Sequence, residues 1–207
     1  MIFELADKLT ELLEAKKLDN AIDLAENELK KIPETDFHKI IGKDLNHMIN
    51  ELKEFIRTFD KTTTEVLKKK QGFLKSIFGT KSNVKPAAYY CEMNGFTINY
   101  DRWFIDLFSF DKFETGDWEW LSDFYDSTEK DLTITGFEEI QKVFQDVHEY
   151  KRFEEPNIDK AYEVCELIVI LRLQELFSKT YKSCASEWTK VPMFVAAHDY
   201  EMIYRTN

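Results

Sequence analysis

The spacing of apolar residues changes once along the chain, near residue 80. Before that point they recur every three or four positions, as Leu5, Leu9 and Leu13 do, which is typical of the buried face of a helix. After it, the dipeptide Asn94-Gly95 separates two apolar runs, a strong signal of a β-hairpin. Helices followed by strands and further helices are typical of the α+β class. The sequence therefore predicts an α+β fold in two units, residues 1–80 and 81–207.

The first unit opens with two predicted helices, with Asp19 as the N-cap of the second and Pro33 ending it. The segment 17–33 resembles the second helix of a tetratricopeptide repeat, with Ala21 and Pro33 at the separation usual in that family. Glu28 stands where the family has a small residue, and no second copy follows at a period of about 34 residues. We interpret the segment as an ordinary helical hairpin.

A long amphipathic helix is predicted next, capped by Thr35 and carrying one apolar face over residues 37–59. Thr62 and Glu65 then have the spacing of a capping box, which predicts the start of a separate connecting helix at about 63–78. This helix is basic, because the chain has no acid between Glu65 and Glu92 but has six lysines there: Lys68, Lys69, Lys70, Lys75, Lys81 and Lys85.

The second unit is predicted to contain a small, mostly antiparallel sheet backed by two helices. Strands are expected on both sides of Asn94-Gly95, then through the region rich in aromatic and β-branched residues, and again near the end of the chain. A capping box at Thr135–Glu138 predicts the first helix. The second is predicted to be buried, because its middle is apolar all round. The expected ranges are 87–93, 96–100, 103–109 and 191–197 for the strands and 137–147 for the first helix, while the second helix starts at 156–157 and has its middle at 167–171.

The net charge of −11, from 28 Lys and Arg against 39 Asp and Glu, argues against nucleic acid as the main partner, since phosphate backbones select basic surfaces. Residues 1–80 hold 14 basic and 15 acidic residues, which leaves 14 basic and 24 acidic residues in the second unit. The second unit therefore carries −10 of the charge, together with every Tyr and Trp.

Residues 101–131 combine ten acids and three bases with a high density of aromatic side chains. Trp and Tyr supply large contact areas, and acids around them select basic partners. We therefore predict a non-catalytic protein that binds a basic protein or peptide. Its acidic character is shared by immunity proteins that neutralise basic toxins. The predicted binding residues are Trp103, Asp117, Trp118, Glu119, Trp120, Asp123 and Asp126.

Two alternatives stay open. Adjacent His and Asp residues serve as metal ligands in phosphohydrolases of the HD type, so His198 and Asp199, with nearby carboxylates, are candidate residues of a metal-dependent hydrolase. The basic amphipathic helix at 63–78 could instead hold the protein on an anionic membrane surface. The sequence favours a binding protein over an enzyme, and it predicts neither a cofactor nor a metal site.

The chain is expected to be cytoplasmic. Its N-terminus has an acid at Glu4 and lacks the pattern of a secretory signal. Its longest purely apolar run, 167–171, is far shorter than the roughly 20 residues of a membrane span. The odd set of Cys91, Cys165 and Cys184 predicts reduced thiols and no disulfide framework.

Overall fold

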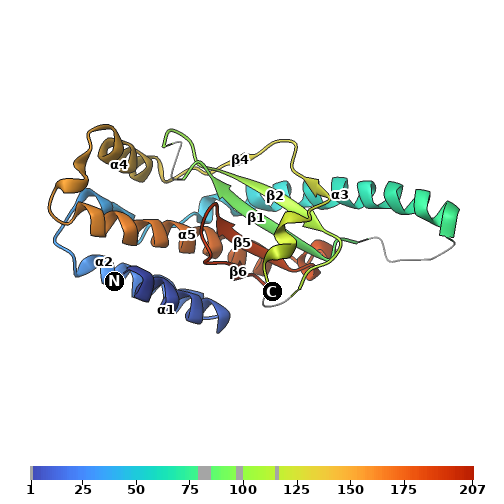
Figure 1. Cartoon of the computed structure of the whole chain (residues 1–207), viewed down its shortest axis with the longest axis horizontal. Helices are drawn as coiled ribbons and strands as arrows, with labels where there is room; N and C mark the ends of the chain where they lie inside the picture. The colour runs from blue at the N-terminus through green and yellow to red at the C-terminus, as the bar shows by residue number, and fades with distance from the viewer. Residues whose placement is uncertain (1, 79–84, 97–99, 115–116) are drawn as a thin grey trace.

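The protein folds into helices packed around a mixed sheet, which confirms the α+β class (Figure 1). The computed structural model describes residues 2–78, 85–96, 100–114 and 117–207, with the backbone alone for Ile2, residues 70–78 and Glu187. The α-helices are α1 (Ile2–Glu14), α2 (Leu18–Lys30), α3 (Ile49–Phe78), α4 (Glu138–Glu149) and α5 (Ile158–Lys182). The strands are β1 (Ala88–Asn94), β2 (Phe104–Phe110), β3 (Asp126–Ser127), β4 (Leu132–Thr133), β5 (Met193–Ala197) and β6 (Tyr204–Arg205). Short 3₁₀ helices are η1 (Asp36–Ile40), η2 (Asn46–Met48), η3 (Glu119–Ser122), η4 (Arg152–Glu154) and η5 (Glu187–Lys190).

The strands form one sheet in the order β3-β2-β1-β5-β6, and β4 also pairs with β2. β1 runs antiparallel to β2, in register from Ala88↔Phe110 to Asn94↔Phe104. β1 and β5 are parallel, and the other described pairings are antiparallel. The prediction of a final strand that rejoins a mostly antiparallel sheet is therefore confirmed.

The hairpin after Asn94 has a longer connection than predicted. Gly95 has a positive φ of 79°, and the strand that pairs with β1 is β2, which begins at Phe104. Of the strand expected at 96–100, residues 97–99 lie outside the described part, and Phe96 and Tyr100 are in turns. Phe96 points into the core, with its ring centroid 5.0 Å from that of Trp103.

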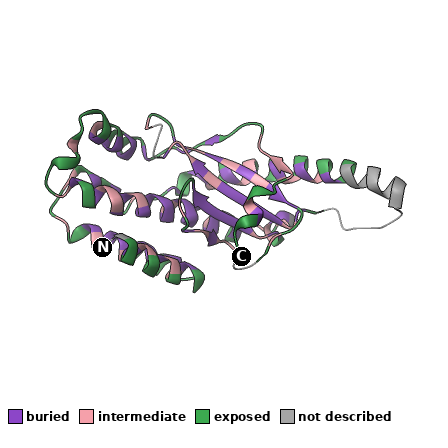
Figure 2. Ribbon diagram, viewed as in Figure 1, coloured by how far each residue is buried: buried purple, intermediate pink, exposed green. Residues whose placement is uncertain are grey.

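The inner face of the sheet packs on α5 and α3. Tyr89, Cys91 and Met93 point from β1 into a hydrophobic cluster that also contains residues of α1, α2, α3, α4 and α5. Figure 2 shows this burial along the sheet and along α5, whose apolar middle is buried as predicted. α3 contacts β2 and β3, so it is the second helix behind the sheet, where the sequence predicted α4. Both predicted units contribute to one core.

The long helix predicted from Thr35 is interrupted. Thr35 does cap a helix, but that helix is the short η1, in which the Thr35 N–H donates to His38 Nδ1 at 3.1 Å. Ile41 is extended and Gly42 has φ +72°, a left-handed conformation that ends the helix there. η2 follows, and α3 begins only at Ile49.

Two predicted helix starts lie inside helices. Asp19 falls in the first turn of α2, whose N-cap is Lys17. Thr62 lies within α3, where its hydroxyl donates to the Phe59 carbonyl at 2.9 Å. A threonine hydroxyl can bond to a carbonyl of the preceding turn as well as to a helix end, so the same residue pattern fits both places. The connecting helix predicted at 63–78 is thus the C-terminal half of α3.

The capping box predicted at Thr135 is not formed either. Phe137 is the N-cap of α4, and the Glu138 carboxylate accepts the Gly136 N–H with both oxygens at 2.9 Å. Thr135 Oγ1 lies 3.0 Å from His47 Nε2 instead. This contact ties the entry of α4 to the loop before α3, and it brings the His47 ring against Gly136.

We expect Gly136→Ala to destabilise the fold by about 1–2 kcal/mol in urea unfolding, from backbone strain and from displacement of the exposed His47 ring. Gly136 has φ +94°, and an added Cβ would lie 2.7 Å from His47 Cε1. Gly42→Ala is the matched control, because Gly42 has φ +72° but nothing within 4 Å of a Cβ, so only the backbone strain of about 1 kcal/mol applies. Adding His47→Ala to Gly136→Ala should recover part of the loss. Equal effects of the two single glycine variants would contradict the contact with His47.

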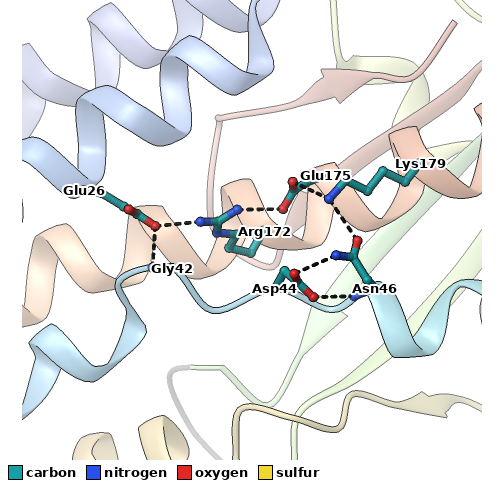
Figure 3. Close-up of polar contacts among 7 residues, drawn as sticks. All are labelled: Glu26, Gly42, Asp44, Asn46, Arg172, Glu175 and Lys179. Atoms are coloured by element: carbon teal, nitrogen blue, oxygen red, sulfur yellow. Dashed lines mark hydrogen bonds and ion pairs between the residues drawn. The ribbon is translucent and has the colours of Figure 1, made fainter.

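A charged network joins α2, α5 and the loop between η1 and η2 (Figure 3). Arg172 on α5 donates from Nη2 to Glu26 Oε1 at 2.6 Å and from Nη1 to Glu175 Oε2 at 2.8 Å. Glu26 also accepts the Gly42 N–H, at 2.9 Å. Each of the three charged side chains is only 11% exposed. The network extends through Lys179, which bonds Glu175 and the Asn46 side chain. It fixes the helical hairpin to the central helix.

Candidate functional site

The outer face of the sheet carries a second, smaller apolar cluster, made of Ala88, Tyr90, Phe110, Trp120, Phe194 and Ala196. The chain after β2 folds back over this face through η3. The Trp120 ring centroid lies 4.7 Å from that of Phe110 and 5.3 Å from that of Phe194. Trp120 Nε1 donates to the Asp117 carbonyl at 2.8 Å. This packing holds η3 in place and brings Trp118 to the edge of the cluster.

The structure separates the residues that were predicted to bind together. Trp103 is fully buried in the main core and Trp120 is 6% exposed, so neither offers a surface to a partner, whereas Trp118 is 41% exposed. Asp117, Glu119 and Asp123 are exposed on the same segment, and Asp126 is half-buried in β3. Asp123 Oδ2 lies 3.4 Å from Lys112 Nζ, and Asp117 Oδ1 accepts the Glu119 N–H at 2.8 Å.

Trp118 lines an open groove of about 980 Å³ between α1, η3 and the chain that follows β5. The groove is lined by Asp7, Thr10, Glu11, Glu14, Tyr90, Trp118, Leu121, Ala197, Asp199, Tyr200, Glu201 and Ile203. We call it the acidic groove. Four parts of the chain that are distant in sequence meet there, and only the part at Trp118 was predicted to bind a partner.

Five carboxylates line the acidic groove. Asp7, Glu11 and Glu14 lie on one side of α1 because positions four and three apart share a helix face. Asp199 and Glu201 line the groove from the chain that follows β5. Among the described residues that line the groove, none is basic. The five carboxylates therefore have no cationic partner among those residues.

The second wall is shaped by a tight turn after β5. The His198 N–H donates to the Met93 carbonyl at 3.0 Å, and the Tyr200 N–H donates to the Ala197 carbonyl at 3.2 Å. Asp199 has φ +65°, a left-handed conformation that Asp tolerates better than most residues. The turn thereby places Asp199, Tyr200 and Glu201 at the groove.

The floor of the groove is aromatic and apolar. The Trp118 ring centroid lies 5.6 Å from that of Phe194, and that of Tyr90 lies 6.2 Å from that of Phe108, so both rings are held by the outer cluster. Burial, with a smaller effect of Glu92, raises the pKa of Tyr90. Its hydroxyl therefore remains a hydrogen-bond donor. A cation whose stem lies on this floor would find its charged end among the carboxylates.

The side chains of His198 and Asp199, the candidate hydrolase residues, are not arranged as the ligands of a metal centre. His198 Nδ1 lies 2.8 Å from Glu92 Oε1, and His198 Nε2 lies 3.5 Å from Asp199 Oδ1. Of the nearby carboxylates, Asp106 is engaged by Asn94 and Thr128, which donate to its two oxygens at 3.0 and 3.1 Å. No group of three or more His, Cys, Asp or Glu side chains within the described residues is arranged to hold a metal ion.

Segment 63–78, which the membrane hypothesis places on a lipid surface, is partly buried within the protein. Thr63 is buried and bonds Ser109, with 2.6 Å between the two hydroxyl oxygens. Leu67 is buried as well, while Val66 is exposed. The side chains from Lys70 to Phe78 lie outside the described set, and so do Lys81 and the rest of 79–84. No described helix is both long enough and apolar enough to cross a bilayer.

A carboxyl with a shifted pKa lies behind the wall of the groove. Burial raises the pKa of Glu166, on α5, from 4.5 to about 7, and hydrogen bonds from the Tyr200 and Tyr162 hydroxyls offset part of the effect. The Tyr162 hydroxyl lies 3.0 Å from His148 Nε2, and the Tyr100 ring stacks on His148 at 4.5 Å between centroids. Tyr200 belongs both to this cluster and to the groove.

The groove residues that sequence reasoning missed are on α1 and after β5. The acids at 7, 11 and 14 do show a signal, since they fall on the side of α1 opposite to the buried Leu5, Leu9 and Leu13. Such a stripe is also typical of any solvated helix face, which is why it was not singled out. Asp199 was noticed only as the partner of His198, and Glu201 was not singled out.

Comparisons of the chain with protein-family models, with curated proteins and with solved structures give no match.

Proposed function

We propose that this protein is a non-catalytic binding protein that holds a basic segment of another protein in the acidic groove. The observation that carries the proposal is the combination of five carboxylates with aromatic side chains in one groove that no described base lines. Electrostatic complementarity of this kind selects basic partners and speeds their encounter. We place the protein in the cytoplasm, a location supported by its three free cysteines, of which Cys91 and Cys165 are buried.

The floor explains why a protein segment fits better than a simple cation. An Arg or Lys side chain can pack on Trp118 and keep its charge near Glu11 or Asp199. Where the charged group itself lies over the ring, the cation–π contact is worth about 0.5–1 kcal/mol at an exposed site. A segment with several such residues would engage both walls at once. The exposed Asp117, Glu119 and Asp123 would extend the negative field beyond the groove.

The proposal is tested by binding of an arginine-only peptide, followed through tryptophan fluorescence and calorimetry at low salt. We expect the triple variant Asp7→Lys/Glu11→Lys/Glu14→Lys to weaken binding by about 30-fold or more, because three attractions become repulsions. Trp118→Ala should weaken it by about fivefold. Raising the salt concentration should weaken binding to the wild type and reduce the difference between variants.

The matched control changes the net charge equally but away from the groove. Glu51, Glu65 and Glu149 are exposed on α3 and α4 and do not line it. Glu51→Lys/Glu65→Lys/Glu149→Lys should therefore weaken binding by only about two- to threefold, through the overall field of the protein. Equal losses in the two triple variants would mean that binding follows net charge alone, and the assignment to the groove would be wrong.

A further inference from the structure

A pocket of about 280 Å³ lies where α2 begins beside the C-terminal part of α5. We call it the basic pocket, because its described lining includes four lysines and two acids, a local charge of +2 in a chain whose net charge is −11. Of the described residues, none lines both this pocket and the acidic groove. The charged residues that line the basic pocket are Lys16, Lys17, Lys179 and Lys182, with Asp19 and Glu175.

Most of the positive charge in the basic pocket is not neutralised by the fold. Lys179 pairs with Glu175 at 2.7 Å. The Lys16 ammonium donates to the Arg205 carbonyl, and burial, with a smaller effect of the Arg205 charge, lowers the pKa of Lys16. A lowered lysine pKa indicates that no negative charge compensates the ammonium. Within the described part of the chain, three lysines of the pocket have no carboxylate partner: Lys16, Lys17 and Lys182.

The first turn of α2 adds backbone donors to the pocket. Lys17 is the N-cap of this helix, and no side chain caps it. The first backbone bond of the helix runs from the Ala21 N–H to the Lys17 carbonyl, at 3.0 Å. The N–H groups of Leu18, Asp19 and Asn20 come before that bond, so they have no acceptor within the helix, and all three residues line the pocket. A helix N-terminus of this kind attracts anions.

Two buried hydroxyl side chains also line the basic pocket. Ser178 on α5 is 3% exposed and Tyr204 in β6 is 5% exposed. Neither hydroxyl has a hydrogen-bond partner among the described residues, and neither oxygen belongs to the fully enclosed unpartnered atoms. The Thr180 hydroxyl on the same helix, by contrast, donates to the Leu176 carbonyl at 2.8 Å. Ser178 and Tyr204 therefore keep two free donors at the pocket, and an acceptor bound there would satisfy them.

We propose that the basic pocket is a phosphate-binding site, which takes inorganic phosphate or the phosphate group of a small phosphate monoester. Phosphate oxygens accept hydrogen bonds, and ammonium, backbone N–H and hydroxyl groups all donate them. The pocket is larger than a single ion needs, since about 10–15 Å³ of such space holds one water molecule, so the organic part of an ester also has room. This site is separate from the acidic groove, and it does not depend on the function proposed for that groove.

The test measures binding of inorganic phosphate and of glycerol 3-phosphate to the whole protein by calorimetry, at an ionic strength held constant with sodium chloride. We expect saturable binding at one site per chain. Ser178→Ala should weaken binding by about three- to tenfold, as the loss of one hydrogen bond predicts. The substitution removes a hydroxyl without a partner among the described residues, so urea unfolding should show unchanged stability. Tighter binding of the ester would identify it as the ligand class, and tighter binding of inorganic phosphate would identify the free ion.

A second pair of variants separates the pocket from the overall charge of the protein. Lys17→Met/Lys182→Met removes two exposed lysines of the pocket and should weaken binding by about tenfold. Lys61→Met/Lys68→Met removes two exposed lysines of α3 outside the pocket and should weaken it less than about twofold. Equal losses in the two lysine pairs would overturn the inference. It would also be overturned by wild-type affinity in Ser178→Ala, or by the absence of saturable binding of both probes.

Discussion

Arg172→Met should reduce the free energy of unfolding at pH 7 by about 2–3 kcal/mol. The substitution preserves the length of the side chain but removes the cation that Glu26 and Glu175, each 11% exposed, share, and leaves them only the contacts with Lys30 and Lys179. Removing one partner of a buried ion pair is costly because the remaining charge was desolvated on folding. The measurement is urea unfolding followed by circular dichroism, with the slope of the transition checked for a two-state process.

The matched control is the exposed pair between Arg57 and Glu54 on α3, whose side chains are 65% and 58% exposed. Arg57→Met should change the stability little, because water screens such a pair. A loss below about 1 kcal/mol would mean that the network in Figure 3 contributes no more to stability than the exposed pair.

Glu166→Gln should make the protein more stable at pH 8 by about 2–3 kcal/mol and leave its stability unchanged near pH 4.5. The pKa of Glu166 is about 7 in the folded protein and has its ordinary value of 4.5 in the unfolded chain. Between these values the folded state holds a proton that the unfolded chain has lost, so the stability of the wild type falls as pH rises from 4.5 to 7 and is then constant. Glutamine cannot ionise, so the variant lacks this fall.

The stability curves are compared by urea unfolding from pH 4.5 to 8. Glu149→Gln on α4 removes one charge from an exposed site, and its curve should stay parallel to that of the wild type. A constant difference between Glu166→Gln and the wild type over the whole range would contradict the raised pKa. This experiment uses the protein without a partner, so its outcome is independent of whether the groove binds a basic segment.

Elements with strong periodicity could be predicted from the sequence, because their burial is a local property of the chain. The apolar face of α1 and the all-apolar middle of α5 lie in the core as expected. Helix starts were less predictable, because threonine hydroxyls serve helix interiors and tertiary contacts as well as caps. Thr62 bonds a carbonyl within its own helix, and Thr135 contacts His47, which lies in η2 before α3. Neither contact has a signature in the sequence.

The sequence predicted which kinds of side chain the candidate site would contain, but not where the site lies or which residues form it. A cluster of tryptophans and acids favoured a binding surface, but burial divides neighbours that look alike in sequence: Trp120 packs on Phe110 whereas Trp118 is exposed. The acidic groove itself depends on α1 and the turn at Asp199 meeting beside η3. That meeting is a consequence of packing over long sequence separations, which no local pattern encodes.

The parallel pairing of β1 with β5 has a consequence for how the chain reaches this fold. Cys91 pairs with Val195, so the centre of the sheet joins residues about a hundred positions apart. Such a contact requires closure of a long loop, which slows folding compared with the helical hairpin that precedes it. During synthesis β1 leaves the ribosome before β5, so one edge of β1 is unpaired until β5 has been made. In that interval the unpaired edge can pair with other chains. Helix α5 must be made before β5 can lie beside β1.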